Sequence, residues 1–246
     1  MFVDGGRHEH ASNVVNFLKT VGVKKIDILW GSHPDWNHIQ AQAEILKNFQ
    51  VDKLYSSVDY TTCVSEKKCK SDDVKYIKDE VKRQGKKVNV LYPGDTLSIG
   101  DFTFYIIGPN VSKYTTNTNA SSLVWIMSYG NRKYMFTGDM EEKQAKTDAL
   151  LSSAKKAGLL NIKADVFKYP HHGYQSLSKT FFNAISPKYV IVPDHKSCSS
   201  FKGGSTLGDL NIPYYRLCKH SNILITSDGE SLNVKQDVNL DNYKFN

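Results

Sequence analysis

Hydrophobic positions near the start of the chain alternate between helical and strand spacing. Residues 10–23 carry apolar side chains at the three- and four-residue intervals of an amphipathic helix, and residues 24–32 (KKIDILWGS) form an apolar run that is too short for a helix. Residues 37–49 return to the helical spacing. The pattern therefore predicts a helix, a strand and a second helix in that order.

The following segments continue this alternation. Residues 71–86 start with a serine and two acids and finish with basic residues before a glycine, so we expect a helix with Ser71 as its N-cap. Residues 87–109 contain short strand patterns separated by Pro-Gly-Asp and Gly-Asp turns. Residues 121–139 contain two strand patterns joined at Gly130 and Asn131, which predicts a β-hairpin.

The second half of the chain shows the same mixture. Residues 141–158 and 178–188 have helical patterns, residues 164–173 and 189–194 have strand patterns, and residues 222–234 read as a last β pair. Helices interposed between strands predict a layered α/β architecture. Since the sequence contains no linker and no internal repeat, we expect residues 1–246 to form a single domain.

Composition limits the class of protein without fixing its function. The chain of 246 residues is long enough to bury a full core, and its formal net charge of +7 permits an anionic partner such as nucleic acid, a phosphorylated ligand or a wall polymer. The lysines are dispersed, so solubility explains most of them equally well. The sequence contains no stretch of 18 apolar residues, and its first ten residues do not form a secretory signal.

Four cysteines leave two interpretations open. Cys63, Cys69, Cys198 and Cys218 lack the C-x-x-C spacing of a structural zinc site. Cys63 and Cys69 could close a small loop as a disulfide in an exported protein, or all four could be free thiols in the cytosol.

A histidine-rich cluster follows the first predicted strand. His33, Asp35 and His38 lie in the segment SHPDWNH, where a loop leaving a strand can direct residues i, i+2 and i+5 to one point. Neutral imidazoles and carboxylates are the ligands of zinc, manganese and iron. The alternative is that these residues are ordinary polar loop residues that cap the next helix.

Two further polar clusters follow later strands. Asp139 comes directly after the predicted hairpin, where a Gly-Asp pair is also a common turn. His171 and His172 follow the next strand, and adjacent histidines on an extended loop point in different directions. One of them can bind a metal while the other orients it or contacts the substrate.

Together, these clusters resemble the metallo-β-lactamase superfamily, and within it the hydrolase domain of the ComEC competence proteins of bacterial DNA uptake. The segments that carry the resemblance are MFVDGG, IDILWGSHPDWNHI, PGDTLSIGDFTFYIIGP, TNASSLVWIMSYGNRKYMFTGDM and ADVFKYPHHGYQSLSKTFFNAISPKYVIVPD. The resemblance implies an α/β (α+β) fold, the four-layer αββα sandwich, here lacking the family's first β-hairpin before Met1. A longer native chain could carry a signal peptide or an anchor, so localisation is open between the cytoplasm and the cell surface.

The resemblance also assigns roles to individual residues. It places His33 and Asp35 on one metal ion, His38 on a second and Asp139 between them, with one of His171 and His172 completing the set. The implied cofactor is one or two ions of Zn²⁺ or Mn²⁺.

Other positions are implied to lie beside the ligands. Asn119 stands where many superfamily members have a histidine ligand, and its alternative role is a turn residue. Asp4 is expected to orient the metal ligands without binding the metal itself, or to form a turn with Gly5 and Gly6. Trp36 is either a stacking surface for single-stranded nucleic acid or a lid over the helix.

Asn37 departs from the family pattern. It replaces an aspartate whose carboxylate binds the second metal and holds the attacking water, and an amide is a neutral ligand that accepts no proton at neutral pH. The second metal site is therefore expected to be weakened and the activity reduced.

The implied activity is that of an enzyme, a metal-dependent hydrolase whose metal-bound hydroxide attacks phosphodiester or phosphate ester bonds, with single-stranded DNA as one candidate substrate. The alternative is a degenerate member that binds a metal or an anion with little or no catalysis, which Asn37 favours. A third hypothesis is hydrolysis of a lactam or a thioester, because the same nucleophile attacks carbonyl groups. Substrate and oligomeric state stay open.

Overall fold

The computed structural model describes residues 1–109, 117–194, 198–199 and 201–240. The chain divides into two compact units. Unit 1 comprises residues 1–91 with the described residues of 111–122 and 239–246, and unit 2 comprises the described residues of 92–110 with residues 123–238. The single domain expected for residues 1–246 stays a prediction.

Unit 1 contains a parallel sheet of four strands in the order β1-β2-β3-β4. The strands are β1 (Phe2–Val3), β2 (Lys25–Gly31), β3 (Gln50–Ser56) and β4 (Val88–Val90). The helices are η1 (His8–His10), α1 (Ala11–Thr20), α2 (Trp36–Ile39), α3 (Gln42–Asn48), α4 (Ser71–Arg83) and η2 (Asn119–Ser121).

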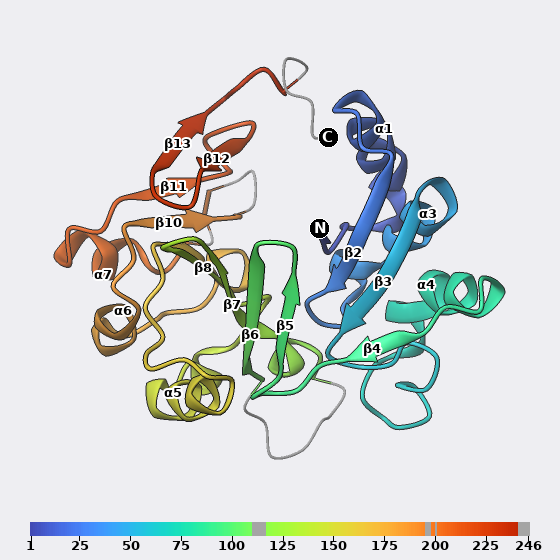
Figure 1. The fold of residues 1–246 in the computed structure, drawn as a ribbon, viewed down its shortest axis with the longest axis horizontal. Coiled ribbons are helices and arrows are strands. Elements are labelled where there is room, and N and C mark those ends of the chain that lie inside the picture. The colour runs from blue at the N-terminus through green and yellow to red at the C-terminus, as the bar shows by residue number, and fades with distance from the viewer. Residues whose placement is uncertain (110–116, 195–197, 200, 241–246) are drawn as a thin grey trace. The chain divides into compact units, whose positions relative to one another are not determined.

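Helices α1, α3 and α4 lie on one face of this sheet (Figure 1). Their apolar sides form one core with the strands, in which Leu29 on β2 packs with Ile45 on α3 and Ile77 on α4. Trp30 and Gly31 are also buried, so β2 ends inside the unit at the point where the histidine-rich segment begins. The core thus holds this strand end in place.

Two predictions in unit 1 need correction. The helix expected over residues 37–49 is divided into α2 and α3, because the N–H of Ala41 donates to the carbonyl of Gly6 instead of continuing the helix. Ser71 is the first helical residue of α4, not its N-cap; Lys70 takes that position with extended backbone and no side-chain capping bond.

Unit 2 contains a seven-stranded sheet in the order β11-β10-β9-β8-β7-β6-β5 and a separate two-stranded sheet. The strands are β5 (Thr96–Ile99), β6 (Phe102–Gly108), β7 (Val124–Tyr129), β8 (Arg132–Phe136), β9 (Val166–Lys168), β10 (Tyr189–Val192), β11 (Tyr214–Arg216), β12 (Ile223–Ser227) and β13 (Leu232–Gln236). The helices are η3 (Glu142–Gln144), α5 (Thr147–Lys156), η4 (His171–Gly173), α6 (Lys179–Ile185) and α7 (Gly204–Asp209).

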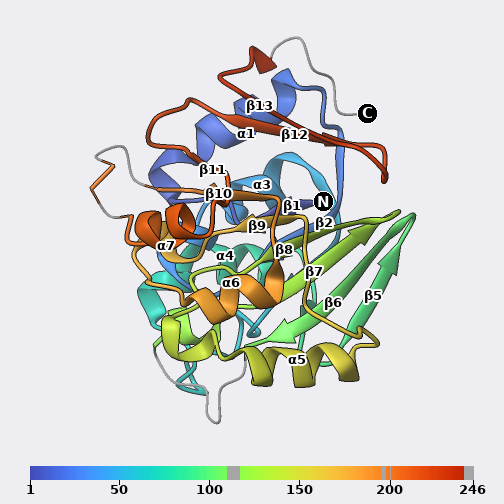
Figure 2. The same ribbon diagram turned by 90° about the vertical axis from the view of Figure 1, so that its left-hand side faces the viewer.

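Strands β5 to β8 pair antiparallel, whereas β8 to β11 pair in parallel. Helix α5 packs against β6, and Figure 2 shows α5 beneath the long strands of this sheet. Buried side chains of α5, α6 and α7 share one core with β9 and β10, including Phe167 and Phe182. The ends of β8, β9 and β10 are thereby fixed by the core of unit 2.

The hairpin predicted at Gly130 is confirmed, with Tyr129 paired to Arg132, and so is the β pair near the end of the chain. The helix predicted over residues 141–158 is shorter, because residues 142–144 form a separate 3-10 turn. Each unit places helices against a sheet, which confirms the α/β class. No helix within the described ranges is long and apolar enough to cross a membrane.

All four cysteines are paired in disulfides. Cys63 bonds to Cys69, which agrees with the first of the two interpretations of the sequence, and Cys198 bonds to Cys218. The members of the second pair are twenty positions apart along the sequence.

Candidate functional site

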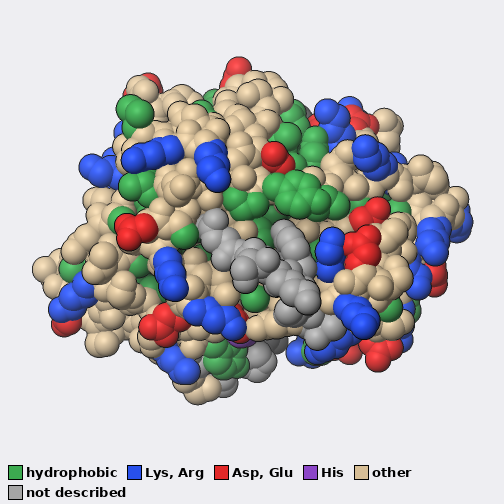
Figure 3. Space-filling model, turned by 90° about the horizontal axis from the view of Figure 1, so that it is seen from below, with side chains coloured by type: hydrophobic (Ala, Val, Ile, Leu, Met, Phe, Trp, Pro, Cys, Tyr) green, Lys and Arg blue, Asp and Glu red, His purple; other side chains and the backbone are tan. Residues whose placement is uncertain are grey.

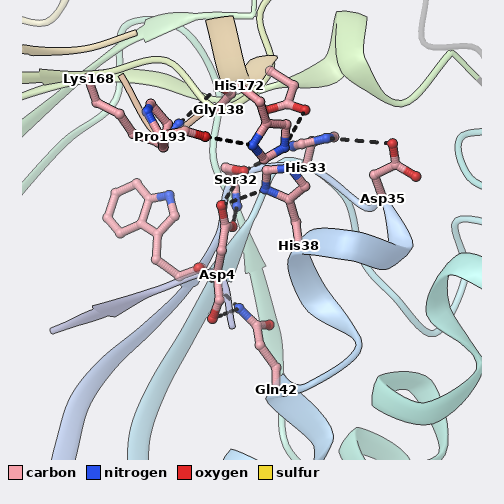
Figure 4. Close-up of polar contacts among 12 residues, drawn as sticks. Asp4, Ser32, His33, Asp35, His38, Gln42, Gly138, Lys168, His172 and Pro193 are labelled. Atoms are coloured by element: carbon pink, nitrogen blue, oxygen red, sulfur yellow. Dashed lines mark hydrogen bonds and ion pairs between the residues drawn. The ribbon is translucent and has the colours of Figure 1, made fainter. Parts of the chain in front are cut away.

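In unit 1, Asp4 lies at the centre of the polar residues beyond the sheet. Its N–H donates to the carbonyl of Trp30 at 2.7 Å, which places the carboxylate beside the end of β2. The N–H of Ser32 donates to Asp4 Oδ1 at 2.8 Å, and the Ser32 hydroxyl donates to Oδ2 at 3.0 Å (Figure 4). The Nδ1 atom of His38 lies 2.8 Å from the same Oδ2.

These contacts fix the proton on the imidazoles of His33 and His38. A carboxylate only accepts, so neutral His38 must carry its hydrogen on Nδ1 and present its lone pair on Nε2. The Ser32 hydroxyl has one proton, which it gives to Asp4, so it accepts from Nδ1 of His33 at 3.0 Å. Both rings therefore direct an Nε2 lone pair away from Asp4, and their centroids are 4.3 Å apart.

The electrostatics of Asp4 follow from the same contacts. Burial alone would raise the pKa of its carboxyl, but the neighbouring His38, with further contributions from His33 and the Ser32 N–H, lowers the pKa below its usual value. Asp4 is thus held as a carboxylate. Burial, and then the charge of Asp35, raise the pKa of Asp73 on α4.

Asp35 and the next residues form the start of α2. The Asp35 carboxylate accepts from the N–H of Trp36 at 3.1 Å, and its other oxygen lies 4.0 Å from Nε2 of His33. Trp36 is 40% exposed, with the Arg7 guanidinium 4.5 Å from its ring centroid. Asn37 is half-buried on the same turn. His38 is on α2 as well, so it does not belong to the loop in which the sequence placed it.

In unit 2, Asp139 lies beyond the end of β8 and is 2% exposed. Nε2 of His172 lies 3.6 Å from Asp139 Oδ2, and Nδ1 of His172 lies 3.0 Å from the carbonyl oxygen of Pro193 (Figure 4). A carbonyl only accepts, so His172 carries its hydrogen on Nδ1 and its Nε2 lone pair faces the carboxylate. Two ligand atoms about 2.1 Å from one ion at a tetrahedral angle lie roughly 3.4 Å apart, so this pair fits a shared ion.

His171 carries its ring hydrogen on the other nitrogen from His172. Its Nδ1 accepts from the Gln175 side-chain amide at 2.9 Å, and Gln175 Oε1 in turn accepts from the N–H of Glu142, which fixes the orientation of the amide. Neutral His171 therefore carries its hydrogen on Nε2. Both histidines have left-handed backbone, with φ of 49° and 50°, so they lie in a tight turn and not on the extended loop expected from the sequence.

Asn119 is the remaining residue that the sequence indicated, and Ser32, Gln42 and Pro193 are residues of the site that it did not indicate. Asn119 begins η2, and its Oδ1 has no hydrogen-bond partner among the described residues. Ser32 and the carbonyl of Pro193 orient histidines, and Gln42 donates to the carbonyls of Asp4 and Trp30. A serine after a strand, a glutamine on a helix and a backbone oxygen are too common in sequences to be recognised as parts of a site.

Within each unit, the donor set fits a divalent transition metal. Neutral imidazoles oriented by an oxygen acceptor on the other ring nitrogen, together with carboxylates, are the usual surroundings of zinc and manganese. His33, His38 and Asp139 are all buried, as expected for groups that bind an ion instead of water. Basic side chains are scattered among acidic ones on the face shown in Figure 3, which agrees with the dispersed lysines of the sequence.

Comparisons with known proteins show what the chain is similar to. The chain is 29% identical over 185 residues to ComE operon protein 3 of Bacillus subtilis, a match that covers 75% of this chain and 22% of that protein's length. It superposes on CmlA, a diiron β-hydroxylase of Streptomyces venezuelae, with a TM-score of 0.51 and 13% identity over 79% of this chain and 44% of CmlA. The metallo-β-lactamase MIM-1 of Novosphingobium pentaromativorans matches with a TM-score of 0.40, 14% identity and coverage of 68% and 64%.

The chain resembles the ComEC-like proteins of the metallo-β-lactamase superfamily. The resemblance to this superfamily and its mixed α/β fold, both expected from the sequence, are thereby confirmed, while no family model matches the chain. The likeness to CmlA shows a shared fold alone. Because the match to ComE operon protein 3 spans about a fifth of the length of that relative, the activity of the whole relative is not transferred by it.

Proposed function

We propose that the chain is a metal-dependent hydrolase of phosphodiester or phosphate ester bonds. The proposed metal ligands are His33, Asp35, His38, Asp139 and His172. One observation carries the proposal, and it occurs independently in each unit: an oxygen acceptor holds the Nδ1–H of an imidazole, which leaves its Nε2 lone pair for a metal. Asp4 is the acceptor for His38, and the Pro193 carbonyl is the acceptor for His172, whose Nε2 also faces Asp139. Second acceptors of this kind orient metal-binding histidines and increase their basicity.

The residues have separate tasks in this proposal. A bound Zn²⁺ or Mn²⁺ ion supplies Lewis acidity and lowers the pKa of water toward about 7. Asp4 holds the proton on Nδ1 of His38 and keeps its Nε2 basic. Asp35 and Asp139 provide negative charge, and Asn37 provides only a neutral amide oxygen. The chain is therefore proposed to bind one ion firmly and a second one weakly.

An anionic phosphodiester is the substrate class that the surface favours. The net charge of +7 attracts anions, and the resemblance to ComEC proteins of DNA uptake favours DNA. Trp36 adjoins the proposed ligand Asp35, and Arg7 lies over its exposed ring. The ion pair of Arg7 with Glu9 is exposed and therefore weak, so the guanidinium can exchange it for a phosphate. A base stacked on Trp36 would place its phosphate near the ligands.

The alternative function is binding of a metal or an anion without turnover. Asn37 is the observation that favours it, because the missing carboxylate removes a negative charge from the proposed second metal position. The two functions differ in one measurable property, since only the hydrolase converts a substrate.

The first experiment measures metal content and hydrolysis on the purified chain. Single-stranded DNA and a chromogenic phosphodiester would be tested with Zn²⁺ and Mn²⁺, together with a β-lactam and a thioester. We expect hydrolysis of a phosphodiester that is abolished by a chelator and by His38→Ala. His220→Ala is the matched control, because His220 pairs with Asp237 near β12 and contacts none of the proposed ligands in the structure as described. Metal binding without turnover of any substrate would support the alternative.

Binding of DNA can be followed separately. Trp30 and Trp125 are 0% and 1% exposed, whereas Trp36 is 40% exposed, so quenching of tryptophan fluorescence by an oligonucleotide reports on Trp36. We expect quenching that disappears in Trp36→Phe. Quenching that persists in this variant would place the nucleic acid elsewhere.

A further inference from the structure

A buried ion pair in unit 2 lies directly beside the carbonyl that holds His172. Pro193 follows β10, and the next residue, Asp194, has a side chain that is 0% exposed. Asp194 Oδ2 accepts from Nε of Arg216 at 2.6 Å. Arg216 is the last residue of β11, and its register partner on β10 is Val192. The ion pair therefore joins the ends of two neighbouring strands at the position where the Pro193 carbonyl points to His172.

Each cysteine of the Cys198–Cys218 disulfide has a backbone hydrogen bond to one member of this ion pair. Arg216 donates a second hydrogen bond, from its NH2 group to the carbonyl of Cys198 at 2.7 Å. The N–H of Cys218 donates to Asp194 Oδ1 at 2.8 Å. Each cysteine thus contributes one backbone group to the pair, and the covalent bond between them keeps both groups in place.

Arg216 also contacts residues that pack against η4, the turn that contains His171 and His172 (the histidine turn). The Arg216 guanidinium lies 5.0 Å from the ring centroid of Phe201, and a Cβ added to Gly173 would lie 3.1 Å from that ring. The N–H of Lys202 donates to the carbonyl of Gly173 at 2.9 Å. The Pro193 carbonyl therefore holds the imidazole of His172, while Lys202 and Phe201, the second of which lies under Arg216, hold the next residue, Gly173.

We infer that Asp194 and Arg216 are positioning residues for His172, and that the Cys198–Cys218 disulfide maintains their ion pair. They set the ring orientation and the Nδ1–H tautomer of His172 through the Pro193 carbonyl, so that its Nε2 faces Asp139. This inference rests on the proposed function only in assigning His172 to a metal. The cost of burying a charged pair is itself a reason to look for a positioning role, because apolar residues would stabilise such a region equally well.

The test has one readout that needs no metal. The chain has eight histidines, so selective labelling of histidine makes the ring nitrogens of His172 assignable by long-range proton–nitrogen NMR. We expect the Nδ1–H tautomer in the wild-type chain and its loss, or exchange with the Nε2–H tautomer, in Arg216→Met. An unchanged tautomer in a folded Arg216→Met protein would overturn the inference.

The second readout is affinity for Zn²⁺ and Co²⁺, measured by competition with a chromophoric chelator. Removing groups that orient a metal-bound histidine typically weakens binding about 10- to 100-fold, and we expect this range for Arg216→Met. Arg132→Met is the matched control, because it breaks an ion pair with Asp165 in the same unit without touching the histidine turn. Equal affinities of the two variants would contradict a positioning role.

Two further variants keep the test decisive if a single substitution prevents folding. Asp194→Asn combined with Arg216→Gln removes both charges and leaves no buried charge unpaired, and it should fold while binding metal more weakly than the wild type. Cys198→Ser combined with Cys218→Ser should also weaken binding, whereas the pair Cys63→Ser and Cys69→Ser in unit 1 should leave the His172 tautomer unchanged. If the wild type shows the expected tautomer but binds no metal, the proposed function fails and the positioning role stands.

Discussion

The hydroxyl of Tyr60 occupies the space next to Gly31 that a side chain would need. A Cβ added to Gly31 would lie 1.8 Å from the Tyr60 hydroxyl oxygen, far inside any allowed contact. Tyr60 is fully buried, and this burial raises the pKa of its phenol well above the usual value. Gly31 is the last residue of β2 and precedes Ser32 and His33, so this contact fixes the strand end from which the first proposed ligand projects.

Gly31→Ala is expected to destabilise the chain by about 2–4 kcal/mol, because overpacking of a filled core costs roughly 1–3 kcal/mol and a hydroxyl stands in the way as well. Tyr60→Phe in the same chain should recover part of this loss, since the ring carbon behind the hydroxyl would lie 3.2 Å from the new methyl. Urea unfolding with the disulfides intact measures both effects.

Gly208→Ala is the control for the Gly31→Ala and Tyr60→Phe measurements. Gly208 is on α7, and no atom lies within 4 Å of its added Cβ among the described residues, so this change should leave the free energy of unfolding unaltered or slightly higher. A Gly31→Ala protein as stable as the wild type, or one that Tyr60→Phe does not improve, would show that the strand end adapts freely.

The elements of this chain were largely predictable from hydrophobic spacing, and the failures have local causes. The period of residues 37–49 was correctly read as helical, but a backbone bond from Ala41 to Gly6, 35 positions away, divides the helix. Ser71 has the right residue type for a cap, yet the chain enters α4 one residue earlier. Neither tertiary contacts nor exact helix boundaries are encoded in residue spacing.

The structure distinguishes His171 from His172, which the sequence could not do. His172→Gln is expected to lower the affinity for Zn²⁺ at least tenfold, because it removes the Nε2 lone pair that faces Asp139. His171→Gln should change the affinity less than threefold, because the Nδ1 atom of His171 already accepts from Gln175. Zinc titrations of both variants and the wild type check this, and equal losses in the two variants would contradict the assignment.

Asn37→Asp is expected to raise the metal content of the chain and the rate of phosphodiester hydrolysis. The substitution restores a carboxylate on α2 between the proposed ligands Asp35 and His38, where an amide supplies no charge. Mass spectrometry of the metal content and a hydrolysis assay would be made side by side. Asn48→Asp adds the same charge at the exposed last residue of α3 and should change neither quantity. If Asn37→Asp leaves both unchanged, the amide is not what limits the site.

The candidate ligands were predictable because histidines and carboxylates at strand ends are a chemical signal in themselves. Their proton arrangement was not, because it depends on acceptors that any sequence contains. Ser32 between Asp4 and His33, and the Pro193 carbonyl behind His172, are found only once the chain is folded. The Asp194–Arg216 pair was missed for the same reason, since its members are 22 positions apart and neither residue type is unusual.

Asp165 gives unit 2 a dependence of stability on pH. Burial alone would raise the pKa of its carboxyl, but the N–H of Lys133 and the charges of Lys188 and Arg132 lower the pKa below the usual value. A carboxyl whose pKa is lower in the folded chain stabilises the fold above the unfolded value of about 3.9. This contribution is lost as the pH falls from about 4 through the lower folded value.

Asp165→Asn is therefore expected to lower the free energy of unfolding by about 1–3 kcal/mol at pH 7, because hydrogen bonds to a charged acceptor are lost. The difference from the wild type should shrink as the pH falls from about 4 through the lower folded pKa of Asp165, because below that pKa the wild type also carries a neutral side chain at this position. Urea unfolding at pH 7, 5, 4 and 3 measures it. Asp101→Asn, at an exposed turn, should shift stability by less than about 0.5 kcal/mol at every pH. A deficit in Asp165→Asn that stays constant down to pH 3 would mean that geometry, and not charge, determines what Asp165 contributes.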